Sequence, residues 1–482
     1  MTSPHAARFA APVFLPLIVA VACSAPPRPA APAPAASSAP SATSSVRPAA
    51  PSSPTPPTVP LRDVVLPDVT ERKLACGLAV WHLPGRAVPL VHLRLVLDSG
   101  RLDDGARPGV AELTAWALAR GAQASMRDGN VPPGLADRIL VEVGDRVTVF
   151  RLDVLDHEAP SALALLGAMV VKPAFRQMDT EAARGMLANT PDPQRAHALD
   201  AVPGQPGAKA IAPQEVQTFY REHYGPKKAH LIVAGRMGLD DTLRRAEAAF
   251  GSWSGAAPAP ATPENPGSDP AIRLIDAPGR SSALVVGSVA SPDVGDATWP
   301  AAAIAWTAVR GKLPQRCPRD VGLEADPVDA IRSSRMTVCY ELPVQEAASA
   351  IERTMAAFRN LDDQRLSEES IARARQSLME GLAVRASSTE GMVALLAGCA
   401  ASGAPPNALL DLSKRLRAGM GAQVLSSAST VMAPERWRWT VVGPADALRD
   451  DLARIRPVHQ AEAIGPSTGP VEPRKAPELG RR

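Results

Sequence analysis

The sequence has few aromatic residues, no excess of one charge and few cysteines, and each shortage excludes a class of protein. Only 4% of its 482 residues are aromatic, so the cores of its domains must be built mainly from alanine, leucine and valine. The 52 basic and 49 acidic residues give a formal net charge of +3, which creates no large field of one sign and gives no indication of a nucleic-acid partner. None of the five cysteines forms a Cys-x-x-Cys pair, so the sequence gives little support for a redox or metal site built from cysteine.

The N-terminus also lacks a hydrophobic run of transmembrane length. Its apolar stretch, residues 9–22, is about 14 residues long, whereas a transmembrane helix needs roughly 20, and it fits the hydrophobic region of a secretory signal peptide. The stretch ends in AVACS, residues 20–24, which resembles a bacterial lipobox in which Cys23 is lipidated and becomes the mature N-terminus. An ordinary signal peptide with an incidental Cys23 is the alternative. If Cys23 is lipidated, Ser24 in place of Asp implies, by resemblance to the usual sorting rule, a lipid anchor on the periplasmic face of the outer membrane.

The remaining cysteines leave one question open. Lipidation of Cys23 would leave Cys76, Cys317, Cys339 and Cys399. Cys317 and Cys339 could form a disulfide in an oxidising periplasm, and buried free thiols are at least as compatible with the sequence.

Composition divides the chain into segments. Residues 24–60 are almost wholly Pro, Ala, Ser and Thr, a composition that cannot bury enough apolar surface to fold, so they predict a disordered tether. The same argument makes residues 257–270 a linker. The predicted organisation is a signal peptide at 1–23, the tether at 24–60, a first folded half at 61–256, the linker at 257–270, a second folded half at 271–463 and a disordered tail at 464–482.

Hydrophobic periodicity predicts alternating strands and helices in both halves. Residues 78–83 and 91–97 have strand patterns and are joined by Pro-Gly-Arg at 84–86, which predicts a hairpin. Residues 138–144 and 146–154 predict a second hairpin. Further strands are predicted at 229–234, 272–276 and 283–289. Helices are predicted at 109–120, 159–171, 180–188, 214–224, 239–250, 347–361, 367–384 and 409–418.

The two halves repeat each other. YGPKKAHLIVAGRMG at 224–238 parallels MAPERWRWTVVGPAD at 432–446, and Pro226 and Pro434 are separated by 208 positions, as are Gly235 and Gly443. Two anchors with one shared offset indicate a duplication. The predicted fold class is α+β, a tandem duplication of two homologous halves, each with a mostly antiparallel or mixed sheet packed against helices.

One stretch carries the strongest functional signal. DSGRLDDGARPGVAELTAWALARG, residues 98–121, predicts a strand end, an acidic turn and an amphipathic helix. It resembles the corresponding stretch of the insulinase, pitrilysin and mitochondrial processing peptidase family of zinc metallopeptidases, the inverzincins. In that family the helix carries His-x-x-Glu-His, whose two His bind zinc and whose Glu activates water. The three functional positions here are Glu112, Ala115 and Trp116, so both ligands and the base are missing.

Other segments extend the resemblance from about Leu74 to about Ile455. They are LACGLAVWHLPGRAVPLVHLRLVLDSG at 74–100, EVQTFYREHYGPKKAHLIVAGRM at 215–237 and LSEESIARARQSLMEGL at 366–382. The resemblance places Asn189 at the position of the family's third zinc ligand, a Glu, and an amide oxygen is a poor zinc ligand beside a carboxylate. A helix C-cap is the structural alternative for Asn189.

The second half of the family supplies an Arg and a Tyr that stabilise the substrate carbonyl. CPRDVGLEADP, residues 317–327, resembles the turn that carries them. The Tyr position falls on Ala325 and the Arg position on Pro318, and the neighbouring Arg319 is a weak candidate for substrate contact. Both sets of catalytic residues therefore differ from the family pattern.

The resemblance implies a catalytically inactive, zinc-metallopeptidase-like lipoprotein without a cofactor, since the family cofactor, zinc, has no ligands. The first expectation is a partner subunit of an active homologous peptidase that contacts peptide or unfolded protein at the bacterial cell envelope, with the membrane reached by the lipid anchor only. A stand-alone peptide-binding or protein-binding scaffold is the alternative. An active zinc metallopeptidase with unusual ligands is a third reading, because fold alone does not decide activity.

Overall fold

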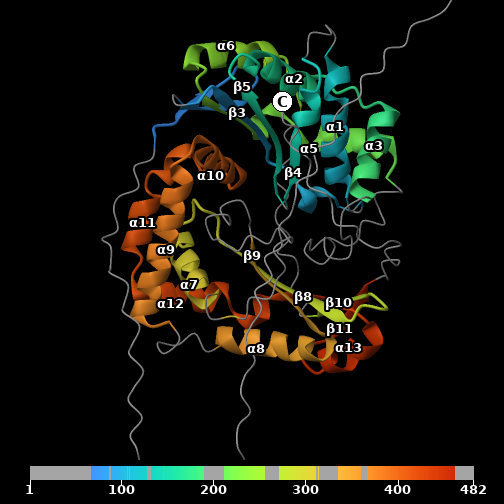
Figure 1. Cartoon of the computed structure of the whole chain (residues 1–482), viewed down its shortest axis with the longest axis vertical. Coiled ribbons are helices and arrows are strands. Elements are labelled where there is room, and N and C mark those ends of the chain that lie inside the picture. The colour runs from blue at the N-terminus through green and yellow to red at the C-terminus, as the bar shows by residue number, and fades with distance from the viewer. Residues whose placement is uncertain are drawn as a thin grey trace, which may run out of the picture. The chain divides into compact units, whose positions relative to one another are not determined.

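The computed structural model describes residues 67–85, 88–105, 107, 109–126, 132–144, 146–188, 211–255, 271–310, 313, 335–359 and 366–461. Within these residues the elements fall into two successive halves, each with one mixed sheet and its own helices (Figure 1). This architecture agrees with the predicted α+β fold of two homologous halves. The limits of the tether, linker and tail remain predictions.

The first half contains six strands and the helices that cover them. The strands are β1 (Thr70–Lys73), β2 (Ala79–Pro84), β3 (Leu90–Leu97), β4 (Leu140–Val143), β5 (Thr148–Leu155) and β6 (Ala229–Gly235). The α-helices described in this half are α1 (Val110–Ser125), α2 (Ala159–Val171), α3 (Gln177–Ala188), α5 (Pro213–His223) and α6 (Leu239–Phe250).

The second half contains five strands and a larger share of helix. The strands are β7 (Ile272–Asp276), β8 (Ser282–Ala290), β9 (Arg335–Pro343), β10 (Arg438–Gly443) and β11 (Val458–Ala461). The α-helices described here are α7 (Trp299–Arg310), α8 (Ala347–Arg359), α9 (Glu368–Ala386), α10 (Thr389–Ala401), α11 (Leu412–Ala418), α12 (Gly421–Val431) and α13 (Ala445–Ala453).

The predicted hairpin between residues 78–83 and 91–97 is wrong. The sheet order is β1-β2-β6-β3-β5-β4, so β6 lies between β2 and β3, parallel to β2 and antiparallel to β3. Alternation of apolar residues identifies a strand but not its neighbour, and the pairing of β6 depends on residues more than 130 positions away in the chain. The second predicted hairpin is confirmed, because β4 pairs with β5 in antiparallel fashion.

The second sheet repeats this unusual connection. Its order is β11-β7-β10-β8-β9, and β10 lies between β7 and β8, parallel to the first and antiparallel to the second. Pro84 pairs with Gly235 in the first sheet, and Asp276 pairs with Gly443 in the second. The two glycines that repeat in the sequence therefore occupy equivalent positions of the two sheets, as a duplication requires.

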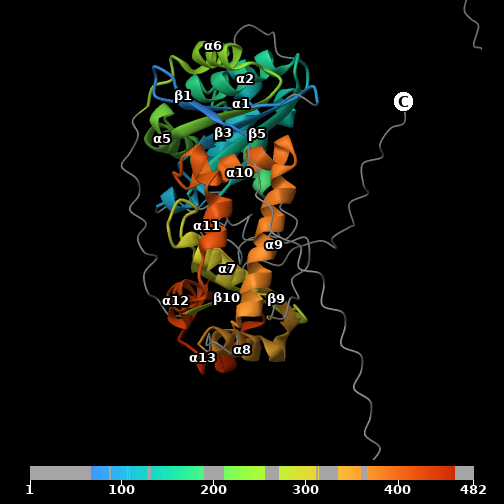
Figure 2. The ribbon, with the colours of Figure 1, turned by 90° about the vertical axis from the view of Figure 1, so that its left-hand side faces the viewer.

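The first sheet is buried on both faces. Along β3, Leu93, Leu95 and Leu97 belong to the core shared with α1 and α2, whereas Val96 belongs to the core that extends into the second half. Successive side chains of a strand point to opposite faces, so His92 and Arg94 share the face of Val96. Helix α10 packs against that face at β3 and β6 (Figure 2).

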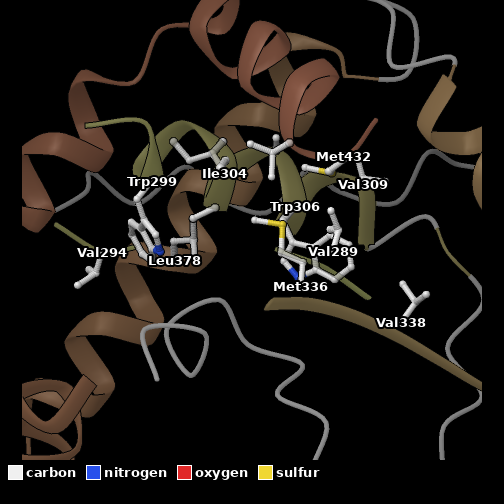
Figure 3. Packing of buried hydrophobic residues seen from close by; sticks show 14 of the residues in the cluster. Val289, Val294, Trp299, Ile304, Trp306, Val309, Met336, Val338, Leu378 and Met432 are labelled. Atoms are coloured by element: carbon white, nitrogen blue, oxygen red, sulfur yellow. The ribbon is translucent and has the colours of Figure 1, made fainter. Parts of the chain in front are cut away.

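Four aromatic side chains form a cluster in the core of the second half. The rings of Phe358 and Trp437 stack with centroids 4.5 Å apart, and Trp306 and Trp439 lie on either side with centroids 5.9 Å from Trp437. Figure 3 shows Trp306 beside apolar side chains of the neighbouring strands. A Cβ on Gly287 would lie only 2.5 Å from the Trp439 ring, so the glycine leaves room for the indole.

Helices α7, α10, α12 and α13 were not predicted from the sequence. Helix α10, TEGMVALLAGCAA, is apolar on nearly every side because it is buried between the two halves, so it has no polar face to reveal a period of 3.6 residues. The predicted helix at 367–384 is present as α9, and Ser367 caps its start, since its side chain accepts a hydrogen bond from the Ser370 N–H. Among the described residues, no helix has both the length and the apolar character needed to cross a membrane.

Candidate functional site

Helix α1 carries the positions that the sequence resemblance assigns to the zinc motif, Glu112, Ala115 and Trp116. It starts at Val110, after Gly109 in a left-handed conformation with φ of 90°, which glycine adopts without the steric cost of a side chain. The Asp104 carboxylate caps this helix start: it accepts hydrogen bonds from the N–H groups of Gly109 at 2.6 Å and Ala111 at 2.8 Å. The acidic turn seen in the sequence thus has a structural role.

Burial gives the Asp104 cap an unusual titration. Removal from water raises the pKa of Asp104 to about 6, although the hydrogen bonds from Gly109 and Ala111 oppose the shift. The nearby Glu112 carboxylate also raises this pKa, and the Arg101 guanidinium lowers it. The start of α1 therefore contains a carboxylate that takes up a proton in mildly acidic solution.

Glu112 occupies the position of the first zinc-binding His, and it forms an ion pair. Its Oε1 accepts a hydrogen bond from Arg101 Nη2 at 2.8 Å, and the side chains of Arg101 and Glu112 are only 19% and 15% exposed. An acidic residue in the first turn of a helix is commonly exposed and favoured by the helix dipole, but this glutamate is largely buried. The turn before α1 places Arg101 beside the helix, so its guanidinium contacts Glu112. In the family, the His at this position would contact the zinc ion.

The other two motif positions are apolar. Ala115, at the position of the catalytic Glu, is completely buried in the core and has no group that can accept a proton. Trp116, at the position of the second His, is half-buried and packs against the same core. An indole can donate a hydrogen bond but has no lone pair in the ring plane for a metal. These side chains can support the helix but cannot activate water.

Charged groups around the start of α1 are paired with one another. Arg107 Nε lies 2.6 Å from Glu215 Oε1 on α5, and His223 Nδ1 lies 4.0 Å from Asp103 Oδ1. In the part of the chain that the structure describes, no group of three or more His, Cys, Asp or Glu side chains is arranged to hold a metal ion.

Helix α3 leads toward the position of the third family ligand. It packs directly against α1, and a Cβ on Gly121 of α1 would meet the Asp179 carboxylate of α3 at 3.1 Å. Glu181, the last acidic residue before the predicted ligand position, is exposed and accepts a hydrogen bond from Gln177. Asn189 itself lies outside the described residues, directly after the end of α3.

Several other predicted positions also lie outside the described residues. They are the lipidation candidate Cys23, the substrate-contact candidate Arg319 and Cys317 of the suggested disulfide. Their roles, and the absence of a bound cofactor, stay predictions.

Sequence reasoning missed Arg101 and the capping role of Asp104. Both lie in the quoted stretch at 98–121, but a pairing across eleven positions through a turn has no sequence signal comparable to the i,i+4 spacing of a helix. Only the acidic residues before a helix start gave an indication, since carboxylates are favoured there.

Comparison with known families identifies the domain that follows α3. Residues 210–378 match the sequence profile of the family described as "Peptidase M16 inactive domain". The match begins just before α5 in the first half and ends within α9 in the second half. None of the curated proteins matches the sequence significantly.

Solved structures share the fold over most of the chain. A peptidase M16 inactive domain from Pseudomonas fluorescens has a TM-score of 0.61 at 15% identity, with 78% of this chain and 98% of that chain covered. The periplasmic protease PqqL from Escherichia coli has a TM-score of 0.55 at 16% identity, with 81% of this chain but 49% of that chain covered. The first half of PqqL alone has a TM-score of 0.55 at 14% identity, with 81% of this chain and 95% of that chain covered.

A third similarity is to a chain of Complex III2 from Candida albicans. Its TM-score is 0.59 at 12% identity, with 81% of this chain and 100% of that chain covered. At these identities the structures show the fold, and the description of the matched domain as inactive agrees with the predicted pseudo-peptidase. Residues 210–378 therefore match the inactive domain of M16 peptidases, and the described part of the chain has the fold of the M16-type structures.

Proposed function

We propose that this protein is a non-catalytic subunit that pairs with an active homologous peptidase and holds peptide or unfolded protein at the bacterial cell envelope. The observation that carries the proposal is the state of the motif helix. Its scaffold is retained, yet Glu112 is paired with Arg101, and Ala115 and Trp116 are built into the core. A fold retained without its catalytic groups supports a role in binding.

The extent of the structural similarity supports the proposed partner. The similarity covers 95% of the first half of PqqL but 49% of the whole PqqL chain, so it corresponds to one of the two halves of PqqL. A chain of Complex III2, which is part of a larger assembly, has the same fold. A second unit, supplied by a separate active chain, would complete the arrangement.

Co-purification tests the partner. The full chain is expressed together with a homologue from the same cells that has an intact His-x-x-Glu-His motif, and the complex is measured by size-exclusion chromatography with light scattering. We expect a stable complex with both chains. Peptide binding by this chain alone, without any complex, would favour the stand-alone scaffold.

Zinc analysis of the purified chain tests the loss of catalysis. We expect no tightly bound zinc and no peptide cleavage that a chelator abolishes. About one zinc per chain together with chelator-sensitive cleavage would contradict the proposal, because a catalytic zinc needs three protein ligands.

The proposed location depends on lipidation of Cys23, which places the folded body at the periplasmic face of the outer membrane. Mass spectrometry of the mature protein and membrane fractionation test it, with Cys23→Ser as the matched variant. The variant is expected to lose the lipid and leave the membrane fraction. Unchanged fractionation would favour an ordinary signal peptide.

A further inference from the structure

A cavity of about 330 Å³ with several charged lining residues lies where the first sheet meets the turn between α9 and α10. The first half contributes three charged side chains, Arg94 on β3, Glu142 on β4 and Arg151 on β5. The second half contributes side chains from the end of α9 and from α10, among them Arg385 and Glu390. The motif residues of α1 do not line this cavity, which belongs to the face of the sheet that α10 covers. Three of its five charged lining residues are arginines.

Asp153, the next residue but one along β5, holds the Arg151 guanidinium in position. Arg151 Nε donates a hydrogen bond to Asp153 Oδ2 at 2.9 Å, while Asp153 Oδ1 accepts one from Arg94 Nη1 at 2.7 Å and lies 2.8 Å from His92 Nδ1. Burial opposes the ionisation of Asp153, but the hydrogen bonds from His92 and Arg94 outweigh it and hold the pKa of that carboxyl well below its usual range. Asp153 is thus a permanent anion that fixes the orientation of the Arg151 guanidinium.

The partner of Arg151 on the cavity side is weakly held. Arg151 Nη2 also pairs with Glu390 of α10, whose side chain is 54% exposed, while the side chain of Arg151 is 29% exposed. Ion pairs with such an exposed member contribute little stability, because water and salt compete for both charges. Glu390 can therefore leave Arg151 at low cost, whereas Asp153 cannot.

Exposed apolar side chains border the same cavity. Val384 lines it and is 71% exposed. Leu140 is 52% exposed and is the direct cross-strand neighbour of Arg151, so both side chains lie on one face of the sheet. A ligand with apolar groups next to a carboxylate fits this combination.

We propose that this cavity recognises a carboxylate of a bound peptide, which replaces Glu390 as the partner of Arg151. The carboxylate is either an acidic side chain or the peptide's C-terminus, since a guanidinium binds both in the same planar, two-point geometry. The proposal rests on the proposed function, because it assumes that the protein binds peptides, and it defines their class as carboxylate-bearing, with apolar neighbours.

Three labelled peptides with one alanine and valine background test the proposal by fluorescence anisotropy on the full chain. The first has a central glutamate and an amidated C-terminus, the second has glutamine and an amide, and the third has glutamine and a free C-terminal carboxylate. We expect the first or the third to bind about tenfold more tightly than the second, as for a charge-assisted hydrogen bond. The peptide with the advantage identifies the source of the carboxylate.

Two variants are expected to change the affinity for the charged peptide in opposite directions. Arg151→Gln should abolish the advantage of the charged peptide, whereas Glu390→Gln should increase it several-fold, because a competing carboxylate is removed. If the ion pair only joined the two halves, both variants would change binding in the same direction. Arg236→Gln, which removes an exposed arginine 3.9 Å from Asp156, is the control and should leave binding unchanged.

The outcomes separate the two proposals. Equal binding of all three peptides would overturn the carboxylate pocket and leave peptide binding intact. No binding of any peptide would overturn both. Glu390→Gln keeps the test decisive if Arg151→Gln fails to fold, because Glu390 is exposed and its loss is tolerated more readily.

Discussion

The ion pair of Arg101 and Glu112 gives a quantitative prediction about the former metal position. The perturbation is a double-mutant cycle with Arg101→Gln, Glu112→Gln and the double variant, and urea unfolding measures the free energy of each. At 2.8 Å the Coulomb attraction is about 1.5 kcal/mol at the dielectric constant of water and about 6 kcal/mol at an effective value of 20. The desolvation of both groups offsets most of the larger figure.

We therefore expect a coupling energy of about 1 to 2 kcal/mol, above the range of exposed pairs. Arg245 and Asp241 on α6, with side chains 36% and 34% exposed, provide the control pair. Their coupling should be at most about 0.5 kcal/mol. Added zinc should not stabilise the wild-type chain in the same assay.

Two results would refute this reasoning. A coupling no larger than that of the control pair would mean that the two side chains do not form a stable pair in solution. Saturating zinc that stabilised the wild type by about 2.7 kcal/mol or more, the value expected at a hundredfold excess over Kd, would mean that Glu112 contributes to a metal site.

Three further predictions concern packing and titration. Gly287→Ala should destabilise the chain by about 1 to 3 kcal/mol, because the new methyl group would meet the Trp439 ring. Gly185→Ala on α3, where the new methyl group meets no other atom, should instead stabilise the chain by up to about 1 kcal/mol. Equal effects of the two variants in thermal or urea unfolding would contradict the packing argument. Trp116→Ala should cost about 1 to 3 kcal/mol, less than the 3 to 5 kcal/mol of a fully buried tryptophan, because the indole is half-buried; no change in unfolding would exclude a packing role. The pKa of Asp104 is raised to about 6 in the folded state, so the stability that it contributes is complete below about pH 4 and is lost as the pH rises through 6. Between about pH 4 and pH 6 the unfolding free energy of the wild type should fall by up to about 3 kcal/mol relative to that of Asp104→Asn. A stability difference between the two proteins that did not change with pH would contradict the raised pKa of Asp104.

Much of the fold followed from local pattern. The bounds of α2 and α6 agree with the predicted helices at every position, because both helices have apolar residues at helical spacing and clear ends. The bounds of β7 and β8 were also predicted to within one residue. The order of the strands in the sheets was not predicted, since β6 and β10 lie between strands that are neighbours in the chain. Strand pairing over such distances depends on the whole sheet.

The site shows the same division. The sequence located Glu112, Ala115 and Trp116 on one helix, because the positions relative to Pro-Gly and the acidic turn are local. It could not show that Arg101 neutralises Glu112, which depends on the path of the turn between them. The pairing of Arg151 with Glu390 was equally invisible, because these residues lie 239 positions apart in different halves.

The sequence by itself determined which side chains occupy the motif positions, and the duplication of the two halves, because residue type and spacing are written along the chain. The tertiary structure decided which charges meet. Whether a carboxylate is a metal ligand, a helix cap or the partner of a guanidinium depends on its neighbours in space and on its exposure to water, and folding alone brings those neighbours together.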